Sequence, residues 1–226
     1  MTQARPSAPH RIPLSKERVL RAAVELADRG GTEAVSMRKL GQELSVDAMS
    51  LYHHVQNKDD VLDGIVDAVV GEIDVSPVDA DWKTELRQLA MTARTVMLRH
   101  PWASHVIEER TVPGPAQMRY MERVLAILRG GGFSLDLAHH SIHVLGSRVL
   151  GFTQDLYDDT DTGRVDPEMA ALMARQMADA YPNISELALA ATHDGGLGGC
   201  DDDVEFAFGL DLILDGLERL RVAEVQ

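Results

Sequence analysis

The stretch SMRKLGQELSVDAMSLYHHVQNK, residues 36–58, decides the fold of the N-terminal part of this chain. Ser36 is suited to cap a helix over 37–44, and Ser45 with Val46 suits a tight turn before a second helix over about 47–54. Helices this short are not stable alone in water, so they must pack against neighbours. The pattern therefore predicts a helix-turn-helix inside a small helical core.

Two amphipathic segments flank the stretch and can supply that core. Ser15 can cap a helix to about residue 29, which Gly30 and Gly31 end, and Asn57 can cap a helix from 58 to about 74. Within the helix-turn-helix, the apolar spacing predicts five inward-facing residues: Leu40, Leu44, Val46, Leu51 and Val55.

The outward-facing residues of the stretch suit DNA, because the second helix of such a pair is laid into the major groove. Small side chains allow close approach to base edges, a methionine can touch a thymine methyl, and the polar and basic groups can bind phosphates. We predict DNA contacts at Ser36, Arg38, Ala48, Met49, Ser50, Tyr52, His54 and Lys58. Another interpretation stays open, since helix-turn-helix domains that bind no DNA exist and Tyr52 could simply cover the core.

Charge is unevenly distributed along the chain. Residues 1–58 hold nine Lys/Arg and six Asp/Glu, a net of +3, while the whole chain carries −14, so the remainder carries −17. This division favours a basic end that approaches a polyanion and an acidic body that does not. An ordinary acidic protein with local fluctuation of charge is the alternative.

The remainder of the chain also has helical periodicity, without a convincing alternating strand. We predict helices at about 80–99, 101–109, 115–129, 134–157, 166–180 and 202–221, with Pro101, Pro113, Pro182 and the glycines at 130–132 as breaks. The predicted fold class is all-α. The predicted domains are a flexible arm at 1–14, a helix-turn-helix domain at 15–75, and a ligand-binding and dimerisation domain at 79–226.

Two broad apolar stripes in this body indicate a homodimer. One includes Phe206, Leu210 and Leu217, and the other includes Leu145 and Phe152, each with glycines that permit close helix approach. Such stripes favour a four-helix bundle formed between two copies. The alternative is that both stripes belong to the core of one chain.

Ligand pockets are mostly apolar with a few polar groups, and flexible methionines suit them. We predict a small-molecule effector bound near Met97, Trp102, His105, Met118, Met121, His143 and Gln154.

We predict no metal, cofactor or catalytic residue. His139 and His143 are one helical turn apart, but they lack the cysteine or HExxH context of a metal site, and residues 158–169 lack two ligands of a calcium loop. Because no enzyme motif is present, an enzyme acting on small molecules is the weaker alternative, beside a dimeric interaction module that binds no DNA.

Several features predict a cytoplasmic location. No apolar run approaches the ~20 residues of a membrane span, and the first residues lack the apolar core of a signal peptide. Cys200 is the only cysteine, so no internal disulfide can form.

Residues 14–74 closely resemble the DNA-binding domain of the TetR family of bacterial repressors, above all in RKLGQEL, SLYHHV and NKDDVLD. The phrases RHPWASHV, RVLAILRGGGFSLDLAHHSIHVLGSRVLGF and FAFGLDLILDGLERL resemble the ligand-binding domain of the tetracycline-repressor subgroup. The resemblance implies a ligand-responsive repressor, a homodimer on a near-palindromic double-stranded operator, released by a small-molecule effector. It places the DNA contacts on the eight residues predicted above. Tetracycline repressors have Gln-Pro where Ala48 and Met49 stand, so the resemblance does not imply the same operator.

Overall fold

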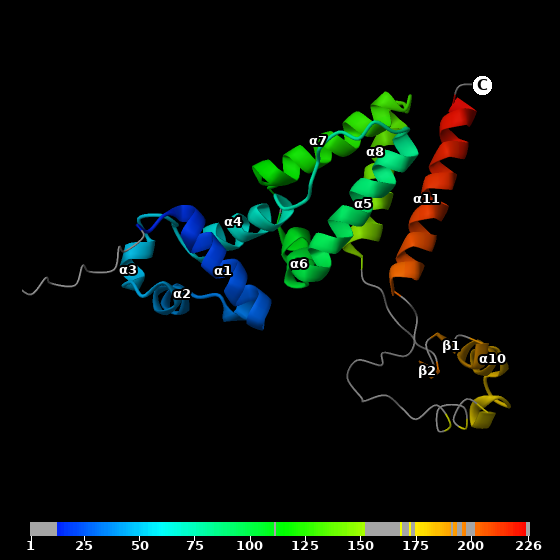
Figure 1. Cartoon of the computed structure of the whole chain (residues 1–226), viewed down its shortest axis with the longest axis horizontal. Helices are drawn as coiled ribbons and strands as arrows, with labels where there is room; N and C mark the ends of the chain where they lie inside the picture. Colours follow the sequence, from blue (N-terminus) through cyan, green and yellow to red (C-terminus); the bar gives the residue numbers. More distant parts are fainter. Residues whose placement is uncertain are drawn as a thin grey trace, which may run out of the picture. The chain divides into compact units, whose positions relative to one another are not determined.

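The computed structural model describes residues 13–110, 112–151, 168, 172, 175–190, 192–193, 196–197 and 202–224. Nearly all regular structure in these ranges is helical (Figure 1), which confirms the predicted all-α fold. Two strands, β1 (Thr192–His193) and β2 (Gly196–Leu197), pair antiparallel with Thr192 opposite Leu197. None of the helices in the described ranges is long and apolar enough to cross a membrane.

The helices follow the chain in this order: α1 (Lys16–Gly30), the 3-10 turn η1 (Thr32–Ala34), α2 (Met37–Leu44), α3 (Ala48–Leu51), α4 (Lys58–Val70), α5 (Trp82–Arg99), α6 (Trp102–Glu109), α7 (Pro115–Gly130), α8 (Leu135–Leu150), α10 (Pro182–Ala190) and α11 (Asp202–Glu224).

Helix α10 is absent from the prediction. Pro182, predicted as a break between helices, is its first residue. Proline is tolerated there because the first amides of a helix have no intrahelical acceptor. Seven of the fifteen residues of the helix predicted at 166–180, and the end of the one predicted at 134–157, lie outside the described residues.

The packing divides the chain into two compact units that interleave in sequence. The first combines Met1–Asp79 with Thr92–Ala126, and the second combines Ala80–Met91 with Ile127–Gln226. The predicted domains instead follow the chain in order, with a boundary at 75–79, and they stay a prediction.

In the first unit, α1 packs against both α2 and α4. Val19, Leu40, Leu51 and Ile65 have no accessible surface, so each helix contributes to one shared core. Burying such side chains stabilises a fold by about 1.5–3 kcal/mol each, which explains how helices as short as α2 and α3 persist.

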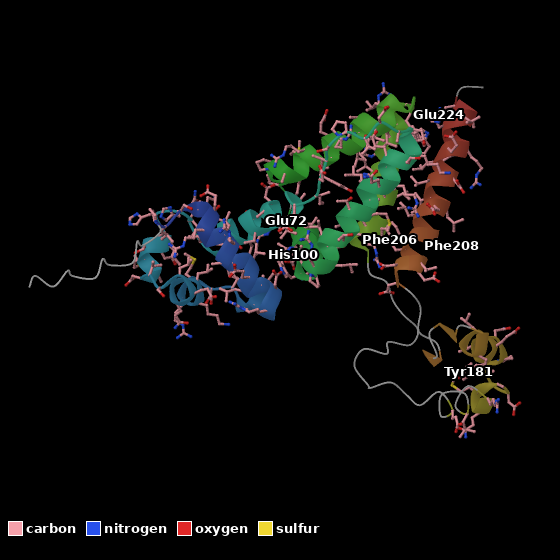
Figure 2. All side chains as sticks on the ribbon, viewed as in Figure 1. Glu72, His100, Tyr181, Phe206, Phe208 and Glu224 are labelled. Carbon is pink, nitrogen blue, oxygen red and sulfur yellow. The ribbon has the colours of Figure 1, made fainter. Side chains whose placement is uncertain are left out.

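In the second unit, α8 and α11 lie side by side (Figure 1). Leu145 on α8 and Phe206, Leu210 and Leu214 on α11 are buried. At the far end of α11, the Glu224 carboxylate accepts a 2.8 Å hydrogen bond from the Ser134 hydroxyl, just before α8 begins (Figure 2). The two helices are therefore joined through their apolar faces and at one end.

Candidate nucleic-acid interface and its connections

The turn between α2 and α3 is held tightly. Ser36 caps α2 by accepting a 3.3 Å hydrogen bond from the Lys39 amide, as predicted. Ser45 ends α2 in the left-handed conformation, with φ of 53°. A β-carbon at Gly41 would lie 3.0 Å from the Val46 carbonyl oxygen, so glycine lets the chain fold closely back on α2.

The second helix of the pair is shorter than predicted. The Asp47 side chain accepts a 2.8 Å hydrogen bond from the Met49 amide and starts α3, which ends at Leu51. Residues 52–54 continue as a turn, since the Tyr52 amide donates to the Met49 carbonyl at 3.3 Å. The sequence predicted 47–54 because its apolar spacing is the same in a helix and in such a tightened end.

The core side of this motif largely matches the predicted pattern. Leu40, Leu51 and Val55 are buried, whereas Leu44 and Val46 are only partly buried. Anchoring Leu51 and Val55 fixes the rotation of α3 about its axis. That rotation turns the intervening residues away from the core.

The predicted DNA contacts are all at least partly accessible to solvent. Met49 is 70% exposed and Tyr52 is 47% exposed, large values for an apolar and an aromatic side chain. Arg38 and Lys58 are exposed, and neither makes an ion pair within the part of the chain that the structure describes. The other four, Ser36, Ala48, Ser50 and His54, are partly exposed. Exposed cations of this kind are suited to phosphates, and an exposed Met49 is suited to base edges.

The junction before α4 fixes the position of Lys58. Asn57 accepts a 2.9 Å hydrogen bond from the Asp60 amide, and Asp60 accepts one of 2.9 Å from the Gln56 amide. These reciprocal bonds resemble a capping box, except that Asp60 binds the amide of the residue before the N-cap. Lys16 on α1 also donates to Asp60 at 3.2 Å. The Gln56 amide, with Lys16, lowers the pKa of Asp60.

A second connection joins α1 to the start of α6. The Asp28 carboxylate oxygen Oδ1 accepts from Trp102 Nε1 at 2.7 Å and lies 2.7 Å from His100 Nδ1. The other ring nitrogen of His100 is 3.5 Å from Glu72, whose carboxylate also pairs with Arg99 at 3.0 Å (Figure 2). The indole N–H of Trp102, a predicted ligand residue, therefore already donates a hydrogen bond to Asp28.

The other predicted ligand residues lie in different surroundings. Met97 is buried, while His105 is exposed and lies 3.3 Å from Glu109. Met121 and His143 are exposed, and Gln154 lies outside the described residues. A predicted pocket made of these residues therefore stays a prediction.

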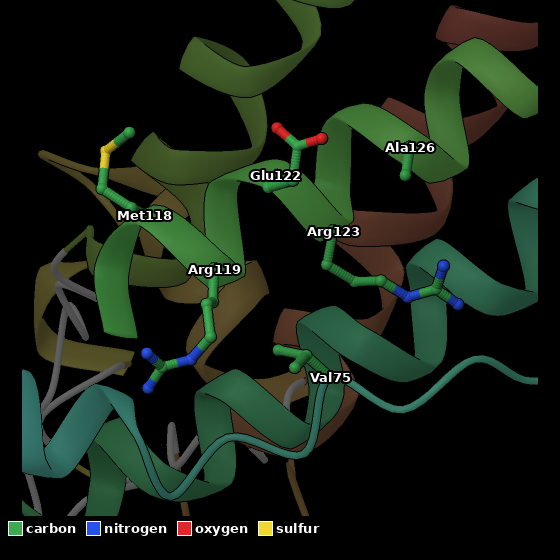
Figure 3. A pocket seen from close by; sticks show the side chains of 6 residues that line it. All are labelled: Val75, Met118, Arg119, Glu122, Arg123 and Ala126. Atoms are coloured by element: carbon green, nitrogen blue, oxygen red, sulfur yellow. The ribbon is translucent and has the colours of Figure 1, made fainter. Parts of the chain in front are cut away.

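Met118 lines a hollow of about 480 Å³ together with Val75, Arg119, Glu122, Arg123 and Ala126 (Figure 3). Of the seven predicted ligand residues, it is the one that lines this hollow. Arg119 and Arg123 extend on the side of Val75, whereas Glu122 points away from it (Figure 3).

The histidines of α8, considered above for a metal ion, lie near one another and near Asp136. The rings of His139 and His143 are 4.7 Å apart, and His140 lies 3.7 Å from Asp136. Across the described residues, no three side chains of metal-ligating type come together. Apart from Glu168, the segment 158–169, considered above for calcium, lies outside them.

The sequence analysis did not identify Asp28 and His100. Both belong to helices assigned from their apolar residues, and periodicity says nothing about which distant partner a polar side chain meets. The quoted phrase RHPWASHV was the only signal, because it contains both His100 and Trp102.

Comparison with known proteins identifies the family. The model of the family described as bacterial regulatory proteins, tetR family, matches residues 19–65. The model described as tetracyclin repressor-like, C-terminal domain, matches residues 76–221. The second match alone covers more than half of the chain. The chain therefore belongs to the TetR family.

Individual relatives agree with this assignment. The repressor DrrR1 of Streptomyces coeruleorubidus is 32% identical over 97% of this chain and 83% of its own length. The class C tetracycline repressor of Escherichia coli is 27% identical over 92% of this chain and 93% of its own. This chain is a ligand-responsive transcriptional regulator with a DNA-binding helix-turn-helix and a helical ligand-binding domain, and the members of its family are regulators rather than enzymes.

A solved relative has the same fold. Apo ActR from Streptomyces coelicolor superposes with a TM-score of 0.75, at 28% identity, over 94% of this chain and 99% of ActR. ActR has also been solved in complex with actinorhodin, with a TM-score of 0.73 over 93% of this chain and 99% of ActR.

Proposed function

We propose that this protein represses transcription as a homodimer, one recognition helix in each half of a near-palindromic operator, and that a small-molecule effector releases it. The observation that carries the DNA role is the surface of α3. Met49 and Tyr52 are exposed there, and Arg38 and Lys58 stand nearby without an ion pair in the described part of the chain. A regulator of this kind works on chromosomal DNA, hence in the cytoplasm.

Each contact residue has a proposed role. Met49 and Ala48 face base edges and set sequence preference, with Ser50 small enough to allow close approach. Ser36, Arg38, Tyr52, His54 and Lys58 bind phosphates and set register.

The dimer is proposed to form through α8 and α11. Each helix buries one face within the chain, yet Phe208 (62% exposed) and Leu212 (56% exposed) remain on the outer side of α11. Leu135 and Val144 are exposed on α8. An apolar surface on two adjacent helices is typical of an interface that a second copy covers.

The effector is proposed to bind in the helical ligand-binding domain and to act on α4. This helix begins at Lys58, beside the proposed phosphate contacts, and its other end reaches Glu72 and the start of α6. Dimeric readers need half-sites about 34–36 Å apart, so a modest shift of α4 prevents both recognition helices from docking together. Coupling of about 1–3 kcal/mol between sites is typical.

A gel-shift experiment with the DNA upstream of the protein's own gene tests the proposal. We expect a specific complex that survives excess competitor DNA, weakens for every sequence with Tyr52→Ala, and changes sequence preference with Met49→Ala. Absence of a specific complex at low salt would refute the DNA role.

Release is tested in the same assay with actinorhodin, the compound bound in the ActR structure. A thermal shift shows whether it binds this protein. If it binds to saturation and operator affinity does not change, effector-driven release is refuted for that compound, and other binders found by thermal shift are then tested.

A further inference from the structure

Three aspartates form a stripe along α4. Asp59, Asp63 and Asp67 follow one another at intervals of four residues, so they lie on one face of the helix. The opposite residues Val61, Ile65 and Val69 are buried in the core. The aspartate stripe therefore lies on the side of α4 that faces away from this core.

Arg110, which ends α6, holds the first two of these aspartates. Its Nη2 lies 3.3 Å from Asp59 and its Nη1 lies 3.0 Å from Asp63. The forked guanidinium thus spans two carboxylates one turn apart. The side chains of Asp59 and Asp63 are 77% and 55% exposed. Such exposed pairs are weak and are screened by salt.

Asp67 is held differently, by the start of α7. Its Oδ1 accepts hydrogen bonds from the backbone amides of Ala116 at 2.6 Å and Gln117 at 3.4 Å. These amides belong to the first turn of α7, where they have no intrahelical acceptor and where the helix dipole favours a negative charge.

Gly114 makes this second contact possible. A β-carbon there would lie 2.3 Å from Asp67 Oδ1, a distance that side-chain atoms cannot share. Asp67 is only partly exposed, so the bond is more protected from solvent than the pairs of Arg110. The segment that joins α6 to α7 therefore contacts α4 in two places. One contact is the exposed ion pairs of Arg110, and the other is the more protected hydrogen bond to Asp67.

We propose that Asp67 and Arg110 are positioning residues that set the angle of α4, with Asp67 as a fixed pivot and Arg110 as an adjustable arm nearer to Lys58. The proposal deepens the function proposed above and rests on it for its consequence in DNA binding. It assigns the passage from the effector region to the reading surface to Asp67 of α4 and to Arg110 and Gly114 of the α6–α7 connection.

The distance between Asp67 and Lys58 turns a small rotation of α4 into a larger displacement of Lys58. Lys58 lies nine residues before Asp67, about 13–14 Å along the helix axis. A rotation of about 10° around Asp67 would then move Lys58 by roughly 2 Å, enough to lose a hydrogen bond to a phosphate. Any displacement at the end of α6 acts on Asp59 and Asp63, between the pivot and Lys58.

The first test measures the joint itself, meaning the contact of α4 with Arg110 and with the start of α7, without DNA. Spin labels are placed at Gln56→Cys, just before α4, and at Glu122→Cys on α7, in a Cys200→Ser background with excess unlabelled protein. We expect one narrow distance distribution in the parent protein. Asp67→Ala and Gly114→Ala should both broaden it, although they alter different elements, because each removes the same contact. Asp67→Asn, which keeps an acceptor oxygen, should stay close to the parent.

The role of Arg110 as the adjustable arm is tested by changing the salt concentration. Raising the salt concentration should shift the parent distribution, because the pairs of Arg110 are screened, and Arg110→Gln should reproduce the high-salt distribution at low salt. Arg119→Gln, on the exposed face of α7, is the matched control and should leave the distances unchanged. Unchanged distances in both Asp67→Ala and Arg110→Gln would overturn the proposal.

The second test measures operator affinity with the DNA upstream of the protein's own gene. We expect a loss of about tenfold for Asp67→Ala and for Gly114→Ala, and a smaller loss for Arg110→Gln. Altered distances with unaltered operator affinity would overturn the role of the joint in DNA binding. If distances change as expected but the parent protein binds no operator, the joint stands and the proposed function fails.

Discussion

The surface around α3 and the outer face of α11 expose their apolar residues in different ways. Around α3 the large exposed apolar side chains are Met49 and Tyr52, isolated among small and polar residues. On α11 they follow one another as Val204, Phe208, Leu212 and Leu220, and Leu135 and Val144 add to them on α8. One surface is polar with two apolar points, and the other is an apolar stripe.

The difference indicates the kind of partner that each surface fits. Isolated apolar groups among donors suit base edges and phosphates, which are mostly polar. A continuous apolar stripe exposed to water is costly, and covering it with a similar stripe removes that cost. The difference supports the proposal that one face meets DNA and the other meets a second copy of the chain.

The largest expected effect comes from placing charge on the apolar stripe. Phe208→Asp combined with Leu212→Asp should convert the proposed dimer to a monomer, because carboxylates would be desolvated at the interface. Operator affinity should fall at least about 100-fold, since a monomer contacts one half-site. Sedimentation and gel shift measure the two effects. Leu98→Asp, at a position 57% exposed on α5, is the control and should stay dimeric. A double variant that still sediments as a dimer would contradict the assigned face.

The next effect concerns the polar surface. Lys58→Ala should weaken operator binding by about tenfold and reduce the salt slope of binding by about 1, because one phosphate contact is lost. Titrations at several salt concentrations measure both. His53→Ala, at an exposed position with no assigned contact, should change neither. If Lys58→Ala leaves the slope untouched, Lys58 does not bind a phosphate.

A smaller effect concerns Gly209, on the side of α11 that meets Arg148 of α8. A β-carbon at Gly209 would lie 2.9 Å from Arg148 Nε, a buried atom that has no hydrogen-bond partner among the described residues. The guanidinium of Arg148 stacks on the Phe206 ring at 4.9 Å. In an Arg148→Ala background, Gly209→Ala should stabilise α11 by about 1 kcal/mol. With Arg148 present the gain should be smaller by at least about 0.5 kcal/mol.

Thermal or denaturant unfolding of the four proteins in this cycle gives the values. Equal gains in stability in both backgrounds would mean that the Arg148 side chain does not require a glycine at position 209. The sequence analysis assigned this glycine to close helix approach, whereas the structure places a side chain of the same protein against it.

The smallest effect concerns the junction that fixes Lys58. Asp60→Asn should lower the stability by a few tenths of a kcal/mol at neutral pH, because the amide keeps an acceptor but loses the charge that faces Lys16. The Gln56 amide and Lys16 lower the folded-state pKa of Asp60. Its contribution is therefore present above the unfolded pKa and is lost as the pH falls through the lower, folded pKa.

Unfolding of both proteins at neutral and at acidic pH measures this difference. We expect it to shrink toward zero on the acidic side, where Asp60 becomes protonated. A difference of the same size at every pH would show that the charge of Asp60 contributes nothing.

The sequence alone was enough to predict the capped helices of the N-terminal part and the exposed side of α3, because both depend on local order along the chain. Ser15, Ser36 and Asn57 cap their helices as predicted, since a cap binds amides two or three residues away. The spacing of Leu51 and Val55 fixes which side of α3 is buried and therefore which side Met49 and Tyr52 occupy. The residues of 36–58 also carried the family resemblance.

Only the tertiary structure decided which distant groups meet. Asp28 reaches Trp102 across 74 positions of the chain, and Asp67 reaches the amide of Ala116 across 49. The hydrogen-bonding capacity of each side chain is visible in the sequence, but its partner depends on how whole helices pack. Periodicity places a residue on a face of its own helix and contains no information about the helix that will lie against that face.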